Sequence, residues 1–175
     1  LAGVGQYILP LICLFGAVIS AVRRTKRKAL ITYVAASKAW QPLDGINWKE
    51  FEILVGEAFR LQGYQVTENH AGGTAGGIDL ILRKGNEKFL VQCKQWKAFT
   101  VGVTIVRELY GVMAAERAVG GFVVTSGQFT KDAEAFAKGR NVELIDGPQL
   151  MTMIRAALAA RKSSVTAALT GQIPA

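Results

Sequence analysis

Histidine and cysteine are scarce in this chain of 175 residues. There is one histidine, His70, and there are two cysteines, Cys13 and Cys93. A single histidine very nearly excludes a histidine-based metal cluster or a Ser-His-Asp triad. Neither cysteine has a metal-ligand neighbour in the sequence, and we expect no disulfide between them. The cysteine content is therefore consistent with a reducing compartment.

Charge is absent from the first part of the chain, and acidic residues are absent from a longer part. Residues 1–22 contain no charged side chain, and no acidic residue precedes Asp44. About 20 apolar residues suffice to cross a bilayer as a helix, and membrane helices tolerate a proline such as Pro10. The basic cluster 23–28 follows this run, so the positive-inside rule places the rest of the chain in the cytoplasm. We expect residues 1–28 to be a transmembrane helix with a basic juxtamembrane cluster, in the cell inner membrane as one span or more. The alternative is a buried core helix.

The basic cluster also accounts for most of the net charge of +8. Outside its five basic residues, 16 basic residues oppose 13 acidic ones, which leaves +3. The domain thus has no globally basic surface, and any contact with nucleic acid must come from a local patch. Lys97, Arg107 and Lys131 are candidates for that patch.

The remaining sequence alternates between helix and strand patterns. We predict a connector over 29–46, a compact domain over 47–162 and a flexible tail over 163–175. Short apolar runs predict strands at 76–82 and 89–96, joined by a turn at 83–88. The complete order is helix, three strands, helix, strand, helix, strand and helix. This order predicts an α/β fold with a mixed central sheet flanked by helices.

Three polar side chains interrupt the two central strands. Gln92 and Lys94 are two residues apart, so they share one face of their strand, and pairing brings Asp79 beside them. An aspartate, an amide oxygen and a lysine suit phosphodiester hydrolysis, with Mg²⁺ or Mn²⁺ bound by Asp79 and Gln92. Lys94 orients the attacking water, stabilises charge or acts as a base. The alternative for Asp79 and Lys94 is a buried ion pair.

Two further metal contacts are candidates. The backbone carbonyl of Cys93 offers another oxygen between the two polar side chains of its strand. Glu52, on the first predicted helix, offers a carboxylate directly or through water, although its place in the pattern favours an exposed position.

Several motifs in order give the chain a family resemblance. They include the stretches 51–52, 76–80, 91–94, 107–111 and 122–126. From about residue 48 to 154 the chain resembles the Mrr-like (type IV) restriction endonucleases, a branch of the PD-(D/E)xK nuclease superfamily. The resemblance implies the restriction-endonuclease-like order αβββαβαβα. It also implies that Asp79, Gln92 and Lys94 form a metal-dependent active site, with Glu52 as an auxiliary residue.

Two functions therefore compete. The first is a membrane-anchored, divalent-metal-dependent DNA endonuclease that acts in restriction of foreign or modified DNA. The second is a catalytically weak or inactive nuclease-like module that binds DNA or a partner at the membrane. Gln92 in place of the superfamily's usual acid, and Ala75 where relatives often have an acid, favour the second. A homodimer, assembled through the first 28 residues, is a further expectation.

Overall fold

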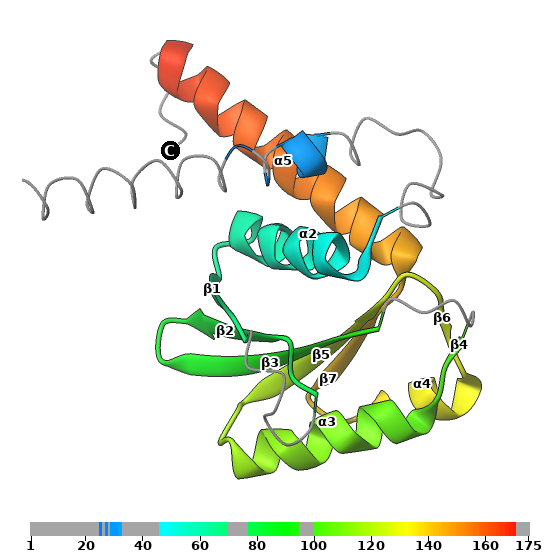
Figure 1. Ribbon diagram of the computed structural model, residues 1–175. Helices are drawn as coiled ribbons and strands as arrows, with labels where there is room; N and C mark the ends of the chain where they lie inside the picture. Colours follow the sequence, from blue (N-terminus) through cyan, green and yellow to red (C-terminus); the bar gives the residue numbers. More distant parts are fainter. Residues whose placement is uncertain are drawn as a thin grey trace, which may run out of the picture.

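The chain folds into a five-stranded sheet with helices on both sides (Figure 1). The structure is a computed structural model that describes residues 25, 27, 29–32, 46–69, 77–94 and 100–170, with backbone alone for 164–170. The elements, in chain order, are α2 (Trp48–Leu61), β1 (Gln65–Glu68), β2 (Leu80–Lys84), β3 (Glu87–Lys94), β4 (Thr100–Val101), α3 (Val103–Ala115), β5 (Gly120–Thr125), β6 (Gln128–Phe129), α4 (Lys131–Ala137), β7 (Val142–Ile145) and α5 (Gly147–Thr170).

The main sheet has mixed strand directions. Its strand order is β1-β2-β3-β5-β7, in which β1, β2 and β3 pair antiparallel and β3, β5 and β7 pair parallel. The predicted mixed sheet flanked by helices is therefore confirmed. The small parallel pair of β4 and β6 was not predicted, because two-residue strands leave no periodic signal.

Each face of the sheet has its own apolar core. On one face, α2 and α5 cover a core that contains Phe51, Phe59 and Ile154. On the other face, α3 and α4 cover a core that contains Val106 and Leu109. Side chains of β3 alternate between the two cores, because neighbouring residues of a strand point to opposite faces. This alternation places Gln92 on the side opposite to Cys93.

Local signals fix both ends of α2. Asn47 accepts from the backbone N–H of Glu50, and the Glu50 carboxylate accepts from the N–H of Asn47, which completes a capping box. Gly63, just beyond the helix, has a φ of +87°, the left-handed conformation that glycine adopts without steric cost. Both signals lie in the local sequence, and they fix where α2 begins and ends.

Several element boundaries differ from the prediction. The turn between β2 and β3 is only Gly85-Asn86, because the charged residues on either side continue the antiparallel ladder, as in the pair Lys84 and Glu87. Helix α5 continues to Thr170, so residues 163–170 are helical where we predicted a flexible tail. Alanine, which has the highest helix propensity, fills four of the five positions 156–160 just before this stretch, so the helix is well formed where it enters it.

Part of the predicted connector packs onto the domain. Residues 29–32 are helical, and Ile31 is only 5% exposed in the core beneath α2 and α5. Arg27 pairs with Glu68 at 2.6 Å and with Glu57 at 3.4 Å. Arg60 pairs with the same two carboxylates, at 2.7 Å from Glu57 and 3.3 Å from Glu68. We call these four residues the N-terminal ion-pair network.

The predicted transmembrane run, residues 1–22, lies outside the described residues. Within the part of the chain that the structure does describe, no helix has both the length and the apolar character needed to span a bilayer.

Replacing Ile31 tests whether the N-terminal segment belongs to the domain. Ile31→Ala removes a nearly buried side chain and should lower the free energy of unfolding by about 2–5 kcal/mol. Ile31→Val is the matched control and should lower it by about 0.5–1.5 kcal/mol. Urea unfolding of the full chain in detergent micelles, followed by circular dichroism, measures both. Equal stability of the wild type and Ile31→Ala would contradict this packing.

Candidate active site at one end of the sheet

The four predicted catalytic residues lie at one end of the main sheet, where Asp79 interacts electrostatically with Glu52 and Lys94. Asp79 lies one residue before β2, and its side chain contacts Glu52 of α2. Lys94 is the last residue of β3, and Glu52 lies in the second turn of α2. Asp79 was predicted within a strand, but it precedes the strand, where its backbone N–H still donates to the carbonyl of Val91 at 2.9 Å.

The Asp79 carboxylate is held by a backbone hydrogen bond. Its Oδ2 accepts from the backbone N–H of Cys93 at 2.6 Å. Burial raises the pKa of Asp79 from 3.8 to about 6. The Cys93 hydrogen bond and the charge of Lys94 oppose this rise, whereas the charge of Glu52 and a side-chain hydrogen bond with it reinforce the rise. The site therefore holds two carboxyl groups in contact, an arrangement in which a bound cation offsets their repulsion.

Glu52 faces Asp79 rather than solvent. Its side chain is 15% exposed, and its Oε2 accepts from Lys49 Nζ at 2.8 Å. The helical pattern alone favoured an exposed position. A carboxylate at the edge of an apolar helix face gives the same pattern whether it points to solvent or to a neighbouring polar site. The structure instead brings Glu52 to Asp79.

Gln92 is the most unusual polar group of the site. It is 1% exposed, and its Oε1 has no hydrogen-bond partner among the residues that the structure describes. An unsatisfied buried acceptor costs about 1–3 kcal/mol. Gly77 lies against the amide: a Cβ at that position would be 3.0 Å from Gln92 Nε2, and its φ is +62°. Glycine therefore allows the backbone to pass close to this side chain.

The ion pair that we kept as an alternative does not form. In the described part of the chain, no salt bridge joins Asp79 to Lys94, and Asp79 is bonded to the Cys93 N–H instead. The Cys93 thiol lies in the apolar core, and burial raises its pKa well above the usual value. The charges of Asp79 and Glu52 raise this pKa further, so the thiol stays protonated and only the backbone carbonyl of Cys93 remains a candidate ligand.

The oxygen donors of the site suit a hard divalent cation. Asp79 and Glu52 offer carboxylates, and Gln92 offers the unpartnered Oε1. Within the described residues, no cluster of three or more histidine, cysteine or acidic side chains could enclose a metal ion. Mg²⁺ commonly binds through one or two carboxylates and keeps several water molecules or substrate oxygens, so this sparse set fits it.

Sequence reasoning missed the position of Thr125. This residue is 0% exposed at the end of β5, opposite Lys94 in the parallel register. Its Oγ1 donates to the Lys94 carbonyl at 2.7 Å and accepts from the Gly127 N–H at 3.0 Å. The hydroxyl therefore holds the end of β3 in place. The available signal in the sequence was that Thr125 is the single hydroxyl residue at the end of an otherwise apolar strand.

Other predicted contact residues do not assemble into the site. Lys97 lies outside the described residues. The Arg107 guanidinium lies 5.3 Å from the centre of the Phe136 ring, on the face covered by α3 and α4. The predicted patch of Lys97, Arg107 and Lys131 stays a prediction.

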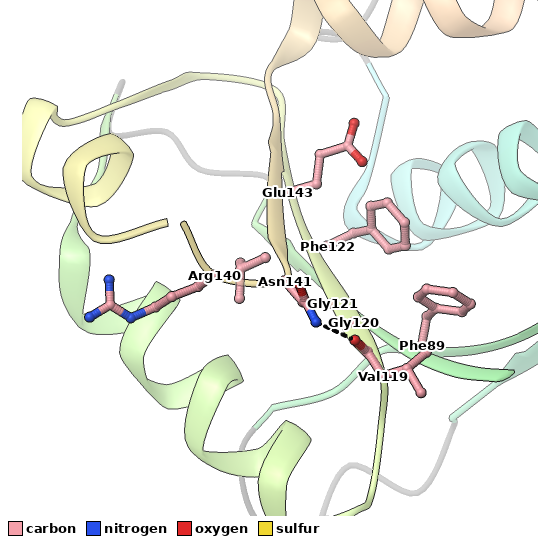
Figure 2. Close-up of a pocket in the computed structure, with 9 residues that line it drawn as sticks. Phe89, Val119, Gly120, Gly121, Phe122, Arg140, Asn141 and Glu143 are labelled. Carbon is pink, nitrogen blue, oxygen red and sulfur yellow. Dashed lines mark hydrogen bonds between the residues drawn. The ribbon is translucent and has the colours of Figure 1, made fainter. Parts of the chain in front are cut away.

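A cavity of about 340 Å³ lies at the opposite end of the sheet (Figure 2). It is lined where β3, β5 and β7 begin, by residues that include Phe89, Gly121 and Glu143. Phe89 and Glu143 extend to one side of the strands and Arg140 to the other. The cavity contains none of the four predicted catalytic residues, since those lie where β3 ends and β2 begins. We therefore place the candidate active site away from it.

Comparison with known proteins identifies the family of the chain. The family Mrr_cat, described as a restriction endonuclease, matches residues 43–154. The chain is 31% identical over 127 residues to the type IV methyl-directed restriction enzyme EcoKMrr of Escherichia coli (strain K12), which covers 68% of this chain and 41% of that enzyme. It is also 31% identical over 102 residues to the uncharacterized protein y4cE of Sinorhizobium fredii (strain NBRC 101917 / NGR234), over 55% of this chain and 26% of that protein. The chain spans less than half the length of either relative.

A solved structure shares the fold. The DNA modification-dependent restriction endonuclease AspBHI superposes with a TM-score of 0.53 at 19% identity, over 82% of this chain and 40% of that chain. At this identity the likeness concerns the fold alone, and it supports the mixed sheet flanked by helices.

The raised pKa of Asp79 predicts a pH-dependent stability in the absence of metal. Because the folded-state pKa lies above the unfolded one, the contribution of Asp79 is fully present below about pH 3.8 and is lost as the pH rises through about 6. Asp79→Asn cannot ionise, so in EDTA at pH 7 it should be more stable than the wild type by about 1–2 kcal/mol, allowing for partial exposure. The difference should shrink at pH 4. Urea unfolding at both pH values measures it.

The matched control is Asp132→Asn, the same chemical change at an exposed position in the first turn of α4. It should give no gain at pH 7. An Asp79→Asn variant that is no more stable than the wild type at pH 7 would refute the pKa shift.

Proposed function

The chain belongs to the restriction endonuclease family that matches residues 43–154, and from this premise we propose that it is a divalent-metal-dependent DNA endonuclease. Its substrate is a phosphodiester bond of DNA, and its biological role is restriction of foreign or modified DNA. The observation that carries the proposal is the pair of contacting carboxyl groups of Asp79 and Glu52, at the end of the sheet where β3 also buries the unpartnered Oε1 of Gln92. A buried polar group without a partner destabilises the fold, whereas at a cation site the same oxygen can serve as a ligand.

Each side chain has a proposed task. Asp79 and Gln92, with the Cys93 carbonyl and Glu52, would hold Mg²⁺ or Mn²⁺, which supplies positive charge against the phosphate and favours ionisation of water. The Cys93 N–H fixes the direction of the Asp79 carboxylate. Lys94 places its ammonium at the scissile phosphate, where it orients the attacking water or stabilises developing negative charge. The attack breaks the phosphorus–oxygen bond to the leaving nucleotide.

Membrane attachment is a separate proposal. We propose that residues 1–22 anchor the chain in the inner membrane with the nuclease domain in the cytoplasm. Their apolar composition and the basic residues that follow support this, as in the positive-inside rule. The N-terminal ion-pair network would then place the domain close to the anchor.

Cleavage of supercoiled plasmid DNA tests the catalytic proposal. The full chain is the appropriate protein, because Ile31 is part of the core and a fragment starting at residue 47 lacks it. With Mg²⁺ or Mn²⁺ we expect nicked or linear DNA, and with EDTA none. Lys94→Ala should lower the rate by about 100-fold or more, the usual contribution of one catalytic group. Lys138→Ala, an exposed lysine after α4, is the matched control and should cleave normally.

Methylated and unmethylated plasmids should be compared in the same assay, since the proposed role includes modified DNA. A protein that binds metal and DNA but never cuts would instead be the binding module of the alternative proposal. A Lys94→Ala variant as active as the wild type would remove Lys94 from the mechanism.

Extraction of membranes tests the anchor. The full chain should stay with the membrane pellet after alkaline carbonate treatment, and a chain lacking residues 1–22 should appear in the supernatant, because about 20 apolar residues hold a helix in lipid. The shortened chain keeps Arg27 and Ile31, so its domain should remain folded. The same fraction for both chains would disprove the anchor.

A further inference from the structure

An exposed tryptophan stands beside the candidate active site. Trp48, the first residue of α2, is 40% exposed, and its ring lies 6.4 Å from that of the fully buried Phe51. Among the described residues, the other exposed large apolar side chains are Tyr110 and Val119. Tyr110 packs edge-on against Phe136, and Val119 precedes β5 at the other end of the sheet. Of these three residues, Trp48 alone lies on the same helix as Glu52, at the end of the sheet that carries the candidate active site.

The connection runs through one turn of helix. Trp48 and Glu52 are four residues apart on α2 and therefore lie on the same face, one turn from each other. Glu52 is the residue whose side chain hydrogen-bonds to Asp79. Lys49, whose side chain is 53% exposed, pairs with Glu52 at 2.8 Å. An aromatic face and an ammonium group thus flank the two carboxyl groups.

This arrangement matches the spacing of a nucleic acid strand. If the scissile phosphate lies at Asp79 and Lys94, the next nucleotide follows about 3.4 Å along the axis in a stacked strand and farther away in an unstacked one. One helical turn, which separates Glu52 from Trp48, is about 5.4 Å. The neighbouring nucleotide therefore comes within reach of the Trp48 ring, and its phosphate comes within reach of Lys49.

We propose that Trp48 stacks on an unpaired base next to the scissile phosphate, while Lys49 contacts the adjacent phosphate. The bases of an intact duplex are stacked on each other and offer no free face, whereas an unpaired base offers one to an aromatic side chain. The substrate class is thus DNA with an unpaired base at the cleavage position. This inference rests on the proposed nuclease function and narrows its substrate.

Binding to two matched duplexes tests the inference. The full chain, in detergent micelles with Ca²⁺, is titrated into a fluorescent 30-base-pair duplex and into the same duplex with a three-nucleotide bulge. The wild type should bind the bulged duplex more tightly. Trp48→Ala should weaken that binding by about 5- to 150-fold and leave the paired duplex nearly unchanged, since stacking is the interaction removed. Trp48→Phe should retain most of the affinity.

Tyr110→Ala is the matched control, because Tyr110 is similarly exposed, at 43%, but lies on α3. It should bind both duplexes as the wild type does, and circular dichroism should confirm that every variant is folded. Equal affinity of wild type and Trp48→Ala for the bulged duplex, equal weakening on both duplexes, or no preference of the wild type would overturn the inference. The same variant binding anionic vesicles less tightly, with DNA binding unchanged, would assign Trp48 to the membrane instead.

These outcomes are separable from the nuclease proposal. A wild type that cleaves plasmid DNA but shows no role for Trp48 refutes only the base contact. A wild type that binds neither duplex and cuts no plasmid refutes both.

Discussion

The hydrogen bond from the Cys93 N–H to the Asp79 carboxylate organises the candidate site. At 2.6 Å it joins the residue before β2 to the end of β3, where the two strands would otherwise separate. Cys93 places its side chain in the core covered by α2 and α5. Its backbone therefore holds Asp79, while its thiol contributes to packing. Gln92 and Lys94 flank this residue on the other face and are therefore positioned by the same strand.

The candidate site lowers the stability of the folded domain. A carboxyl group whose pKa is raised by burial, a second carboxyl group in contact with it and an unpartnered buried amide oxygen all oppose folding. The surrounding packing offsets this cost, since both apolar cores continue to the strands that carry the site. Thr125 adds a local restraint, because its hydroxyl ties the Lys94 carbonyl to the following turn. Such a balance is typical of a functional site.

Much of this arrangement could be predicted from local patterns. The capping box of Asn47 and Glu50, the left-handed Gly63 and the strand Val142–Ile145 depend on residues close in sequence, so their patterns are legible. Period-two alternation likewise placed Gln92 and Lys94 on one face.

Contacts between distant segments could not be predicted in this way. Ile31 enters a core built mainly from residues after position 50, and nothing near it in sequence reveals that partner. The inward position of Glu52 and the link from Thr125 to Lys94 depend equally on how α2 and β5 meet the sheet. The length of α5 was underestimated for another reason, because residues 163–170 are mostly Ser, Thr and Ala and show little apolar periodicity.

The N-terminal ion-pair network has a structural consequence. Arg27 holds Glu68, the last residue of β1, and the next residue, Asn69, donates its backbone N–H to the carbonyl of Asp79 at 2.8 Å. Two consecutive contacts thus lead from the basic segment to the backbone of Asp79 in the candidate site. The N-terminal segment and the candidate site are therefore linked through the end of β1.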